Sequence, residues 1–380
     1  MEKEITATNS VVCKNNDHIF NYYGWPTVGR LPDGTLAVVA SGHRLEHVCP
    51  FGKAMICYSR DEGKTWSEPS AVIDTPLDDR DGGIAVFGNG NVMVTSFNNS
   101  VAAQRAWLQG YLAGSSGNRA RENKARLWGV YLDAIEGDAP VIEAKYLGST
   151  FKISKDGGYT FGDFMRSPVT SPHGPANMRD GNLLHIGNEF NIEDQQPGSR
   201  GMSCYKVSES GEYEYLSSIE WVDNIDGKPL DENCEPHALV LPDGPDGKII
   251  VHIRMEGGGN FTVFQSESYD GGRTFTKPHP IGLAHGSPAH LLVHSSGVLI
   301  SSYGYRREPF GQRVMFSRDS GETWDVDYIL RKDGNSGDLG YPATVELKDG
   351  SLLTVYYQAE KGRDNCVIMQ SIWKLPINTR

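Results

Sequence analysis

Hydrophobic residues occur along this chain in short runs separated by turn-forming residues, a pattern that predicts β-strands rather than long helices. Six times, two such runs flank a tight turn that contains Gly, mostly as Asp-Gly, and each pair of runs predicts a β-hairpin. The predicted hairpins span residues 26–39, 84–97, 175–186, 236–253, 288–303 and 342–357. A third apolar run follows each hairpin, so the repeating unit is a small antiparallel sheet.

A second repeat interleaves with the hairpins and has the form Ser-x-Asp-x-Gly-x-Thr-aromatic. Complete copies begin at Ser59, Ser154, Ser268 and Ser317, and a shortened copy spans residues 208–211. In such a turn the Asp side chain accepts backbone N–H groups and Gly takes positive φ. We expect the final aromatic residue to pack beneath the next strand. Because equivalent turns of different sheets cannot converge on one point, these Asp residues are predicted to be structural.

Six sheets of this kind predict an all-β fold, a six-bladed β-propeller that residues 1–380 form as one unit. The sixth hairpin lacks the Ser-x-Asp repeat, and residues 366–373 are expected to supply its third strand. Residues 5–13 are predicted to add the outer strand that closes the ring.

One segment, residues 101–147, interrupts the strand pattern. The repeats at Ser59 and Ser154 are 95 positions apart, against 49 between the last two repeats. Aromatic and aliphatic residues with i,i+4 spacing predict two short helices in this insertion. The helices are expected to flank a basic turn that holds Arg119, Arg121, Lys124 and Arg126. Such an insertion could cover the edge of a blade, form a lid over a site, or make a dimer contact.

The formal net charge of −12 changes the expected partners. A negative field repels phosphate backbones, so nucleic acid is not an expected partner. The same field repels an acidic sugar, which would therefore need arginines close to its binding site. The sequence contains no apolar run of about 18 residues, so no membrane span is expected.

The N-terminal residues lack the apolar core of a signal peptide, which favours a cytoplasmic protein. The alternative is a secreted or periplasmic protein whose signal peptide has been removed. Six cysteines are present without a CxxC pair or a tight cluster, so neither a zinc site nor another metal or cofactor is expected. The cysteines are expected to be free, mostly buried thiols.

In a propeller, the site should lie where the inner strands converge, at one end of the central channel. Residues at the starts of the six inner strands share that end with residues at the ends of the second strands. The starts hold Trp25, Asp81, His173, Glu235, Ser287 and Tyr341. The ends hold Arg44, Asn98, Glu189, Arg254, Arg306 and Gln358. Three arginines at equivalent ends favour a polar site over solvated surface charge.

On these residues the chain resembles the sialidase (neuraminidase) superfamily, whose six-bladed propellers carry the same Asp boxes, or BNR repeats. Glu235, between Cys234 and Pro236, matches the family's Glu that polarises the nucleophile. Tyr341 matches the catalytic tyrosine, and Arg254 matches one arginine of the triad that binds the substrate carboxylate. Either Arg313 or Arg306 would supply a second triad arginine.

The resemblance implies an exo-acting glycoside hydrolase that removes a terminal, acidic sugar from a glycan or oligosaccharide. Sialidases use a Tyr nucleophile where other glycosidases use a carboxylate. A neutral nucleophile suits an anomeric centre that already carries a carboxylate, and arginines bind that carboxylate through bidentate hydrogen bonds. The resemblance implies no cofactor.

The chain also departs from the family pattern. Gly24-Trp25-Pro26 stands where the first triad arginine is expected, and its bracing glutamate is replaced near Gln358. The loop that carries the family's acid/base Asp has none, so His47, or else Glu46, is the candidate.

Three further residues are candidates at the same end of the channel. Asp81 and Arg80 form a second polar cluster, and Trp25 could either stack on a sugar or pack in the core. The departures leave three other functions open: a hydrolase for another sugar, a lyase, or a non-catalytic carbohydrate-binding propeller.

Overall fold

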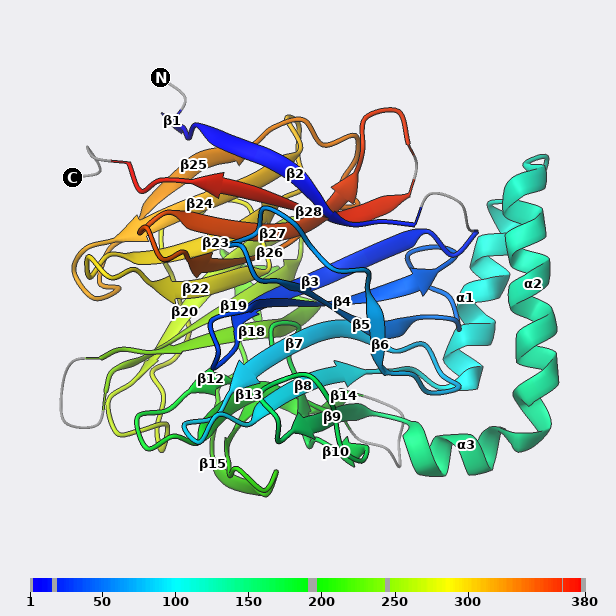
Figure 1. Cartoon of the computed structure of the whole chain (residues 1–380), viewed down its shortest axis with the longest axis horizontal. Helices are drawn as coiled ribbons and strands as arrows, with labels where there is room; N and C mark the ends of the chain where they lie inside the picture. Colours follow the sequence, from blue (N-terminus) through cyan, green and yellow to red (C-terminus); the bar gives the residue numbers. More distant parts are fainter. Residues whose placement is uncertain (1–2, 16–18, 191–196, 243–246, 364, 377–380) are drawn as a thin grey trace.

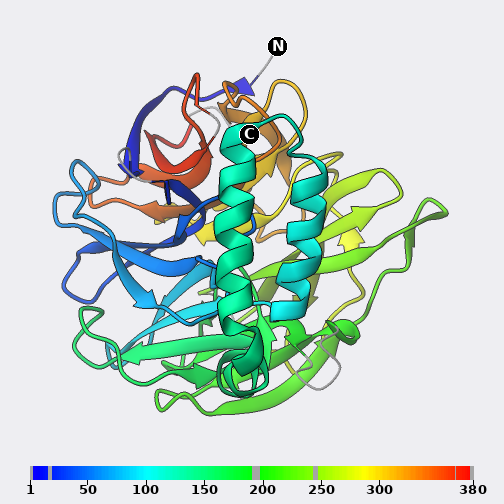
Figure 2. The ribbon, with the colours of Figure 1, turned by 90° about the vertical axis from the view of Figure 1, so that its right-hand side faces the viewer.

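The predicted hairpins form six predominantly antiparallel sheets in the described part of the chain, arranged as blades around one axis (Figures 1 and 2). The computed structural model describes residues 3–15, 19–190, 197–242, 247–363 and 365–376. Residues 243–246, which include the predicted turn residue Asp246, lie outside the described residues. The all-β propeller that the repeats predict is therefore confirmed.

Within each blade, strands that follow one another in the chain lie side by side. Blade 1 contains β3 (Tyr22–Arg30), β4 (Leu36–Arg44), β5 (Lys53–Ser59) and β6 (Ser70–Ile73). Blade 2 contains β7 (Arg80–Val86), β8 (Val92–Phe97), β9 (Ser149–Ser154) and β10 (Met165–Arg166). Blade 3 contains β11 (Val169–Thr170), β12 (Ala176–Asn177), β13 (Leu183–Phe190), β14 (Pro197–Val207) and β15 (Tyr213–Ile219).

The second half of the ring follows the same order. Blade 4 contains β18 (Glu232–Val240), β19 (Ile249–Gly257), β20 (Asn260–Ser268) and β21 (His279–Pro280). Blade 5 contains β22 (Ala289–Val293), β23 (Leu299–Tyr305), β24 (Gly311–Ser317) and β25 (Asp325–Arg331). Blade 6 contains β26 (Gly340–Glu346), β27 (Leu352–Ala359) and β28 (Cys366–Trp373). A small hairpin of β16 (Asn224–Ile225) and β17 (Lys228–Pro229) precedes blade 4.

The N-terminal segment closes the ring as predicted. Strand β2 (Ala7–Cys13) pairs antiparallel with β28 and completes blade 6. The sequence did not predict β1 (Lys3–Glu4), which pairs in parallel with β25 of blade 5. The N-terminal segment thus adds strands to two adjacent blades, β1 to blade 5 and β2 to blade 6. The N- and C-terminal ends of the chain lie on the same side of the molecule (Figure 1).

The Ser-x-Asp turns are structural, with one difference from expectation. In the first turn, Asp61 Oδ1 accepts the Thr65 N–H at 2.9 Å, and Asp61 Oδ2 accepts the Thr65 hydroxyl at 2.7 Å. The final aromatic residue contacts the preceding blade instead of the next strand. Trp66 Nε1 donates to Gln370 of blade 6 at 3.0 Å, so each such turn also joins two blades.

The insertion forms three helices with a 3-10 turn, where two helices were predicted. They are α1 (Val101–Ala113), α2 (Arg119–Ile135), the 3-10 turn Glu136–Asp138, and α3 (Ala139–Tyr146). Asn118 caps α2 by accepting the Arg121 N–H at 3.2 Å. The basic residues expected in a turn therefore lie within α2, because the Asn118 cap starts that helix immediately before them.

The helices pack on the loop after β4. Leu45 and Cys49 of this loop are buried against Trp128 and Leu132 of α2. Figure 2 shows α1 and α2 crossing in front of the ring, at the end where the inner strands begin. The insertion thus lies over that end of the propeller. None of the described helices is long and apolar enough to cross a membrane.

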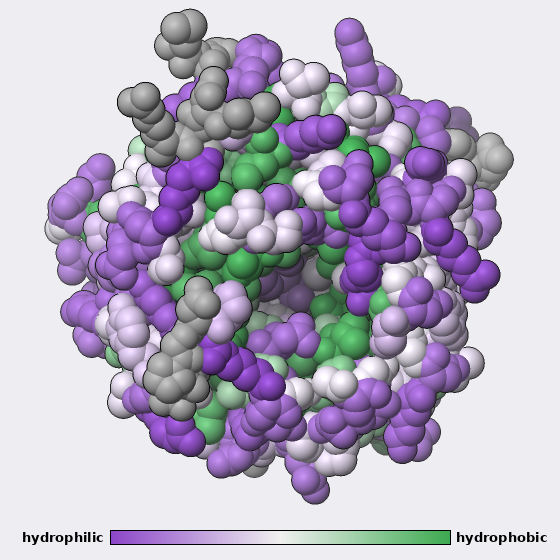
Figure 3. All heavy atoms as spheres, turned by 60° about the vertical axis from the view of Figure 1, so that its left-hand side comes forward, coloured by the Kyte–Doolittle hydropathy of each residue, from purple (hydrophilic) through white to green (hydrophobic). Residues whose placement is uncertain are grey.

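The opposite end of the channel opens on the other face, which is hollowed at its centre (Figure 3). This cavity of about 290 Å³ is lined by residues of successive inner strands, with apolar side chains toward its mouth and the imidazoles of His173, His237 and His290 among its lining. The apolar side chains include Val28, Leu239, Leu292 and Val345.

We expect the Asp61 turn to link stability to pH. Hydrogen bonds from the Thr65 hydroxyl and N–H lower the pKa of Asp61 to about 2 from an ordinary 3.8. Because the folded-state pKa is depressed, the contribution is complete above pH 4 and is lost as pH falls through 2. Asp61→Asn should flatten the pH dependence of urea unfolding in that window. Identical profiles for wild type and Asp61→Asn would contradict this role.

Candidate functional site

Four inner strands carry the same β-bulge near their first residues. In blade 4, Cys234 pairs with Arg254 and His237 pairs with His252, so β18 has one extra residue between these pairs. Blades 1, 2 and 6 have the same irregularity. The bulged residues have φ of +54° at Trp25, +53° at Asp81, +50° at Glu235 and +50° at Tyr341.

These φ angles are costly for residues with a side chain, at about 1–2 kcal/mol each. Four aligned bulges therefore indicate side chains held in place for a purpose other than stability. The sequence marks each one, because every bulged residue precedes Pro or Gly. The inner strands thus begin earlier than predicted; β3 starts at Tyr22 and β7 at Arg80.

Tyr341 and Glu235 meet at the centre of this set. The Tyr341 hydroxyl donates a short hydrogen bond to Glu235 Oε1, across 106 positions of sequence. Arg254 Nη1 donates to Glu235 Oε2 at 2.6 Å. The structure thus brings together the two residues that the resemblance pairs.

Burial and charge set the protonation of this pair. Burial opposes ionisation of Glu235, but the charge of Arg254 and the hydrogen bonds from Tyr341 and Arg254 together outweigh it, and the pKa of the carboxyl lies below its ordinary value. Burial and the Glu235 charge raise the pKa of the Tyr341 phenol well above 10. At neutral pH the pair is a phenol that donates to a carboxylate.

Arg254 and Arg306 lie against the same aromatic ring. Their guanidinium carbons lie 5.0 and 5.1 Å from the Phe261 ring centroid. Arg254 also contacts Glu256 through Nη2. Arg306 donates Nε to the Leu339 carbonyl at 3.1 Å and forms no ion pair with any described residue. Arg306 is therefore the arginine of this pair that no carboxylate neutralises.

Asp81 is buried beside the pair, with 7% of its surface exposed, and no described residue hydrogen-bonds its carboxyl. Burial raises the pKa of Asp81 to about 7, against the nearby charge of Arg80, and the Glu235 charge adds to the rise. A carboxyl with this pKa is partly protonated at neutral pH. It can therefore both give and take a proton there.

His47 lies at the edge of the site and is oriented by Asp338, which the sequence did not suggest. His47 Nδ1 lies 2.9 Å from Asp338 Oδ1, and the Tyr22 hydroxyl donates to the same carboxylate at 2.9 Å. Burial lowers the pKa of His47, and the charge of Arg80 adds to this effect although Asp338 opposes it. The imidazole is thus mostly neutral at pH 7.

Trp25 is buried beneath the site, and its ring is not exposed for a sugar to stack on. Only 1% of its surface is exposed. The Arg80 guanidinium lies 4.4 Å from the centroid of its ring, and the His47 ring contacts it edge-on at 4.8 Å. Of the two expectations for Trp25, this burial favours packing in the core.

Three buried imidazoles lie beneath Tyr341. The ring of His173 lies 6.3 Å from the Tyr341 ring, and the rings of His237 and His290 stack at 4.2 Å. Burial lowers the pKa of all three, that of His290 to about 3. They are neutral at pH 7, so the positive charge of the site comes from its arginines.

Three predicted site residues lie elsewhere. Arg44 is fully buried and pairs with Asp78 at 2.7 Å, so it cannot reach a ligand. Glu46 accepts hydrogen bonds at 2.8 Å from Tyr111 and Lys124 of the helices. Arg313 lies on β24, where Nη1 donates to the Arg331 carbonyl at 2.8 Å. Of the two alternatives for the second triad arginine, the structure therefore places Arg306 at the site.

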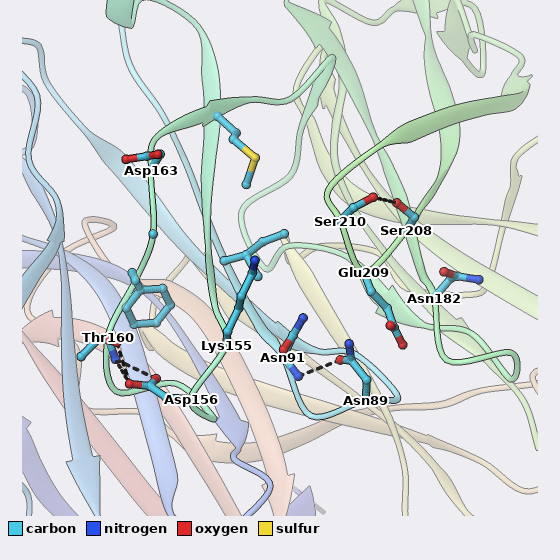
Figure 4. Close-up of a pocket in the computed structure, with 14 residues that line it drawn as sticks. Asn89, Asn91, Lys155, Asp156, Thr160, Asp163, Asn182, Ser208, Glu209 and Ser210 are labelled. Carbon is cyan, nitrogen blue, oxygen red and sulfur yellow. Dashed lines mark hydrogen bonds between the residues drawn. The ribbon is translucent and has the colours of Figure 1, made fainter.

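A larger groove, of about 1050 Å³, lies between the turns of blades 2 and 3 (Figure 4). Its polar residues bond mostly within their own turns. Asp156 accepts from Thr160, and Ser208 lies 2.8 Å from Ser210. None of the predicted site residues lines this groove. Across the described ranges, no group of three or more His, Cys, Asp or Glu residues is arranged to hold a metal ion.

A protein-family model and several solved structures match this propeller. The model of the BNR repeat-like domain family matches residues 205–354. The NanB sialidase of Streptococcus pneumoniae has 14% identity and a TM-score of 0.64, over 96% of this chain and 70% of that one. Residues 205–354 thus match a BNR repeat-like domain, and the chain as a whole has the propeller fold of this sialidase.

Other solved structures share this propeller. A leech intramolecular trans-sialidase complexed with 2,7-anhydro-Neu5Ac has 13% identity and a TM-score of 0.66, over 97% of this chain and 70% of that one. A protein of unknown function from Dyadobacter fermentans has 20% identity and a TM-score of 0.71, over 97% and 98% of the two chains. At these identities the likeness establishes the fold. No curated protein matches this propeller by sequence.

Two functional candidates were missed from the sequence for different reasons. Glu256 follows Arg254 by two positions, so strand periodicity places both side chains on one face of β19, and this signal was available. Asp338 lies in the loop before β26, and no periodicity relates it to His47. Only the folded structure brings these two together.

We predict that Asp81→Asn stabilises the protein at high pH. Between an unfolded pKa near 3.8 and the folded pKa of about 7, folded Asp81 holds a proton that the unfolded chain has released, so stability falls as pH rises through this window. At pH 8 the variant should gain up to about 4 kcal/mol in unfolding free energy, at ~1.4 kcal/mol per pKa unit, and almost nothing at pH 4. Urea denaturation at both pH values checks this. An equal change at pH 4 and pH 8 would show that Asp81 titrates normally.

Proposed function

We propose that this propeller is a sialidase-like glycoside hydrolase that removes a terminal sugar, with Tyr341 as the nucleophile and Glu235 as its base. The observation that carries the proposal is the hydrogen bond from Tyr341 to Glu235 at two strained bulges of blades 4 and 6. Such strain is typical of functional residues. The solved sialidases with the same fold support this reaction class.

In the proposed reaction, the Tyr341 oxygen bonds to the anomeric carbon as the bond to the leaving oxygen breaks. The phenolic proton passes to Glu235, which already accepts it in a hydrogen bond. Arg254 orients this carboxylate. The leaving oxygen takes a proton from an acid. Water then attacks the anomeric carbon, its proton passes to that acid acting as base, and the Tyr341 oxygen leaves and takes its proton back from Glu235. Both steps balance without a cofactor.

Asp81 is the better candidate for this acid, and His47 is the second. A general acid must hold its proton before bond cleavage, and an acid with pKa near the working pH does so while still releasing it. Asp81, with a pKa of about 7, meets this condition. His47, whose pKa is lowered, is mostly deprotonated at pH 7 and is better suited as a base.

The substrate is proposed to be a glycan or oligosaccharide whose terminal sugar is acidic. Arg306 supports an acidic group, because no described carboxylate neutralises it beside Tyr341. Arg44, which was also expected to bind substrate, forms a buried ion pair with Asp78. The number of arginines that a substrate can reach is therefore smaller than the sequence suggested.

Tyr341→Phe tests the nucleophile. Turnover of aryl glycosides, sialosides included, should fall by about three orders of magnitude or more, because the attacking oxygen is gone. Tyr357→Phe is the matched control, since it removes a phenol oxygen from a ring 5.9 Å away. It should retain most activity. Full activity of Tyr341→Phe on a substrate that the wild type cleaves would disprove the proposal, and binding without turnover of any glycoside would favour a non-catalytic carbohydrate-binding propeller.

Asp81→Asn and His47→Ala distinguish the acid. If Asp81 protonates the leaving group, Asp81→Asn should slow cleavage of a sugar–sugar bond by about 10²–10⁴-fold. It should have far less effect on a 4-nitrophenyl glycoside, whose leaving group needs no proton. His47→Ala should affect both substrates alike. The reverse pattern in steady-state kinetics would assign the acid to His47.

A further inference from the structure

Glu256 stands where an acidic group of a substrate would contact Arg254. Both terminal nitrogens of Arg254 are engaged by carboxylates, Nη1 by Glu235 and Nη2 by Glu256. The remaining Nε is buried and has no hydrogen-bond partner. An arginine binds a carboxylate best through two parallel N–H bonds. Arg254 therefore has no free pair of accessible donors while Glu256 is in place.

The two carboxylates on Arg254 differ in how firmly they are held. Glu235 is 21% exposed and also accepts the hydrogen bond of Tyr341. The Glu256 side chain is 40% exposed, and Arg254 is the partner that holds its carboxylate in the described part of the chain. A partly exposed ion pair contributes at most about 1 kcal/mol. Glu256 can thus be displaced into solvent, whereas Glu235 is fixed.

Removing Glu256 would change the charge balance of the site. Arg254 and Arg306 lie against one ring, Phe261, and Glu256 faces Phe261 across the β19–β20 pair. With Glu256 present, two arginines face two carboxylates. Without it, Arg254 and Arg306 face Glu235, while partly protonated Asp81 lies beside Arg80, so the site gains one unit of positive charge for an anion. The three histidines beneath are neutral and add nothing.

We propose that Glu256 is a specificity-determining residue that competes with the acidic group of the substrate for Arg254. An acidic sugar must displace Glu256 before both arginines can bind it, and this displacement weakens its binding. A neutral sugar has no such competitor. Glu256 therefore reduces the preference for anionic sugars that the arginines would otherwise give. This inference rests on the proposed function for the location of the sugar.

Calorimetric titration of Glu256→Gln tests the competition without requiring turnover. The probes are N-acetylneuraminic acid and inorganic sulfate as anions, and methyl α-glucoside as a neutral sugar. Glu256→Gln should bind the anions about two- to fivefold more tightly than wild type, the range that a partly exposed ion pair allows. Affinity for the neutral sugar should not change.

Glu232→Gln is the matched control. Glu232 pairs with Glu256 in the β18–β19 register, so its replacement removes the same charge from the same hairpin. It should leave anion affinity unchanged, because Glu232 makes no contact with Arg254. In a Glu256→Gln/Arg254→Lys double variant the gain should disappear, since lysine keeps the charge but lacks the paired donors. Glu256→Ala provides a second variant with the same expected gain if the Gln variant proves unstable.

Three results would overturn the inference: anion affinity of Glu256→Gln equal to or below that of wild type, an equal gain in Glu232→Gln, or no anion binding in any variant. The proposed function fails on a different measurement, the activity of Tyr341→Phe. Full activity of that variant together with tighter anion binding by Glu256→Gln would retain the arginine site and reject the nucleophile.

Discussion

The site depends on the convergence of the six inner strands on one axis. Each blade is a separate sheet, and the hydrogen bonds that pair its strands run within the blade. Residues that are far apart in sequence meet only because the first strand of every blade faces the same channel. The N-terminal strand β2 completes blade 6 and so fixes the first blade against the last. Tyr341 and Glu235 can meet because this ring is closed.

Within the ring, the repeated bulge determines which side chains reach the site. A regular strand alternates its side chains between two faces, whereas a bulge re-aims one residue. In blades 1, 2, 4 and 6 that residue is Trp25, Asp81, Glu235 or Tyr341. The conformational cost is met by the surrounding hydrogen-bonded strands and the blade cores. The stability of the surrounding blades offsets the strain of the bulges, which direct these four side chains toward the channel end.

Charge pairing then divides the polar residues near the channel into two groups. Arg44 and Asp78 are both fully buried and neutralise each other, so they brace the loop after β4. Arg254, Glu235 and Glu256 are partly accessible and interact with Tyr341 and with each other. Arginines at equivalent strand ends therefore have different surroundings in this protein: Arg44 is paired in the core, and Arg254 lies at the candidate site. The carboxylate that lies beside each arginine, and its exposure to solvent, decides between them.

Local sequence determined most of the fold. The turn residues, the alternation of apolar runs and the Ser-x-Asp repeat are local signals, and they predicted the hairpins, the number of blades and the closing strand 5–13. They also placed Trp25, Asp81, Glu235 and Tyr341 at the starts of inner strands, but they did not predict the bulges there. The third helix and strand β1 were missed, since α3 is short and β1 is formed by only two residues that pair with a distant strand.

The site was only partly determined by sequence. The pairing of Tyr341 with Glu235 followed from equivalent positions in a repeating fold, which is a symmetry that sequence spacing records. Arg44 and Arg254 occupy equivalent positions too, yet one is bound to Asp78 in the core and the other lies at the site. Likewise Glu46 turns to the helices and His47 to Asp338. Sequence determined which residues reach the channel end, but the tertiary structure decided which are free to act there, because charge neutralisation and burial depend on neighbours from other blades.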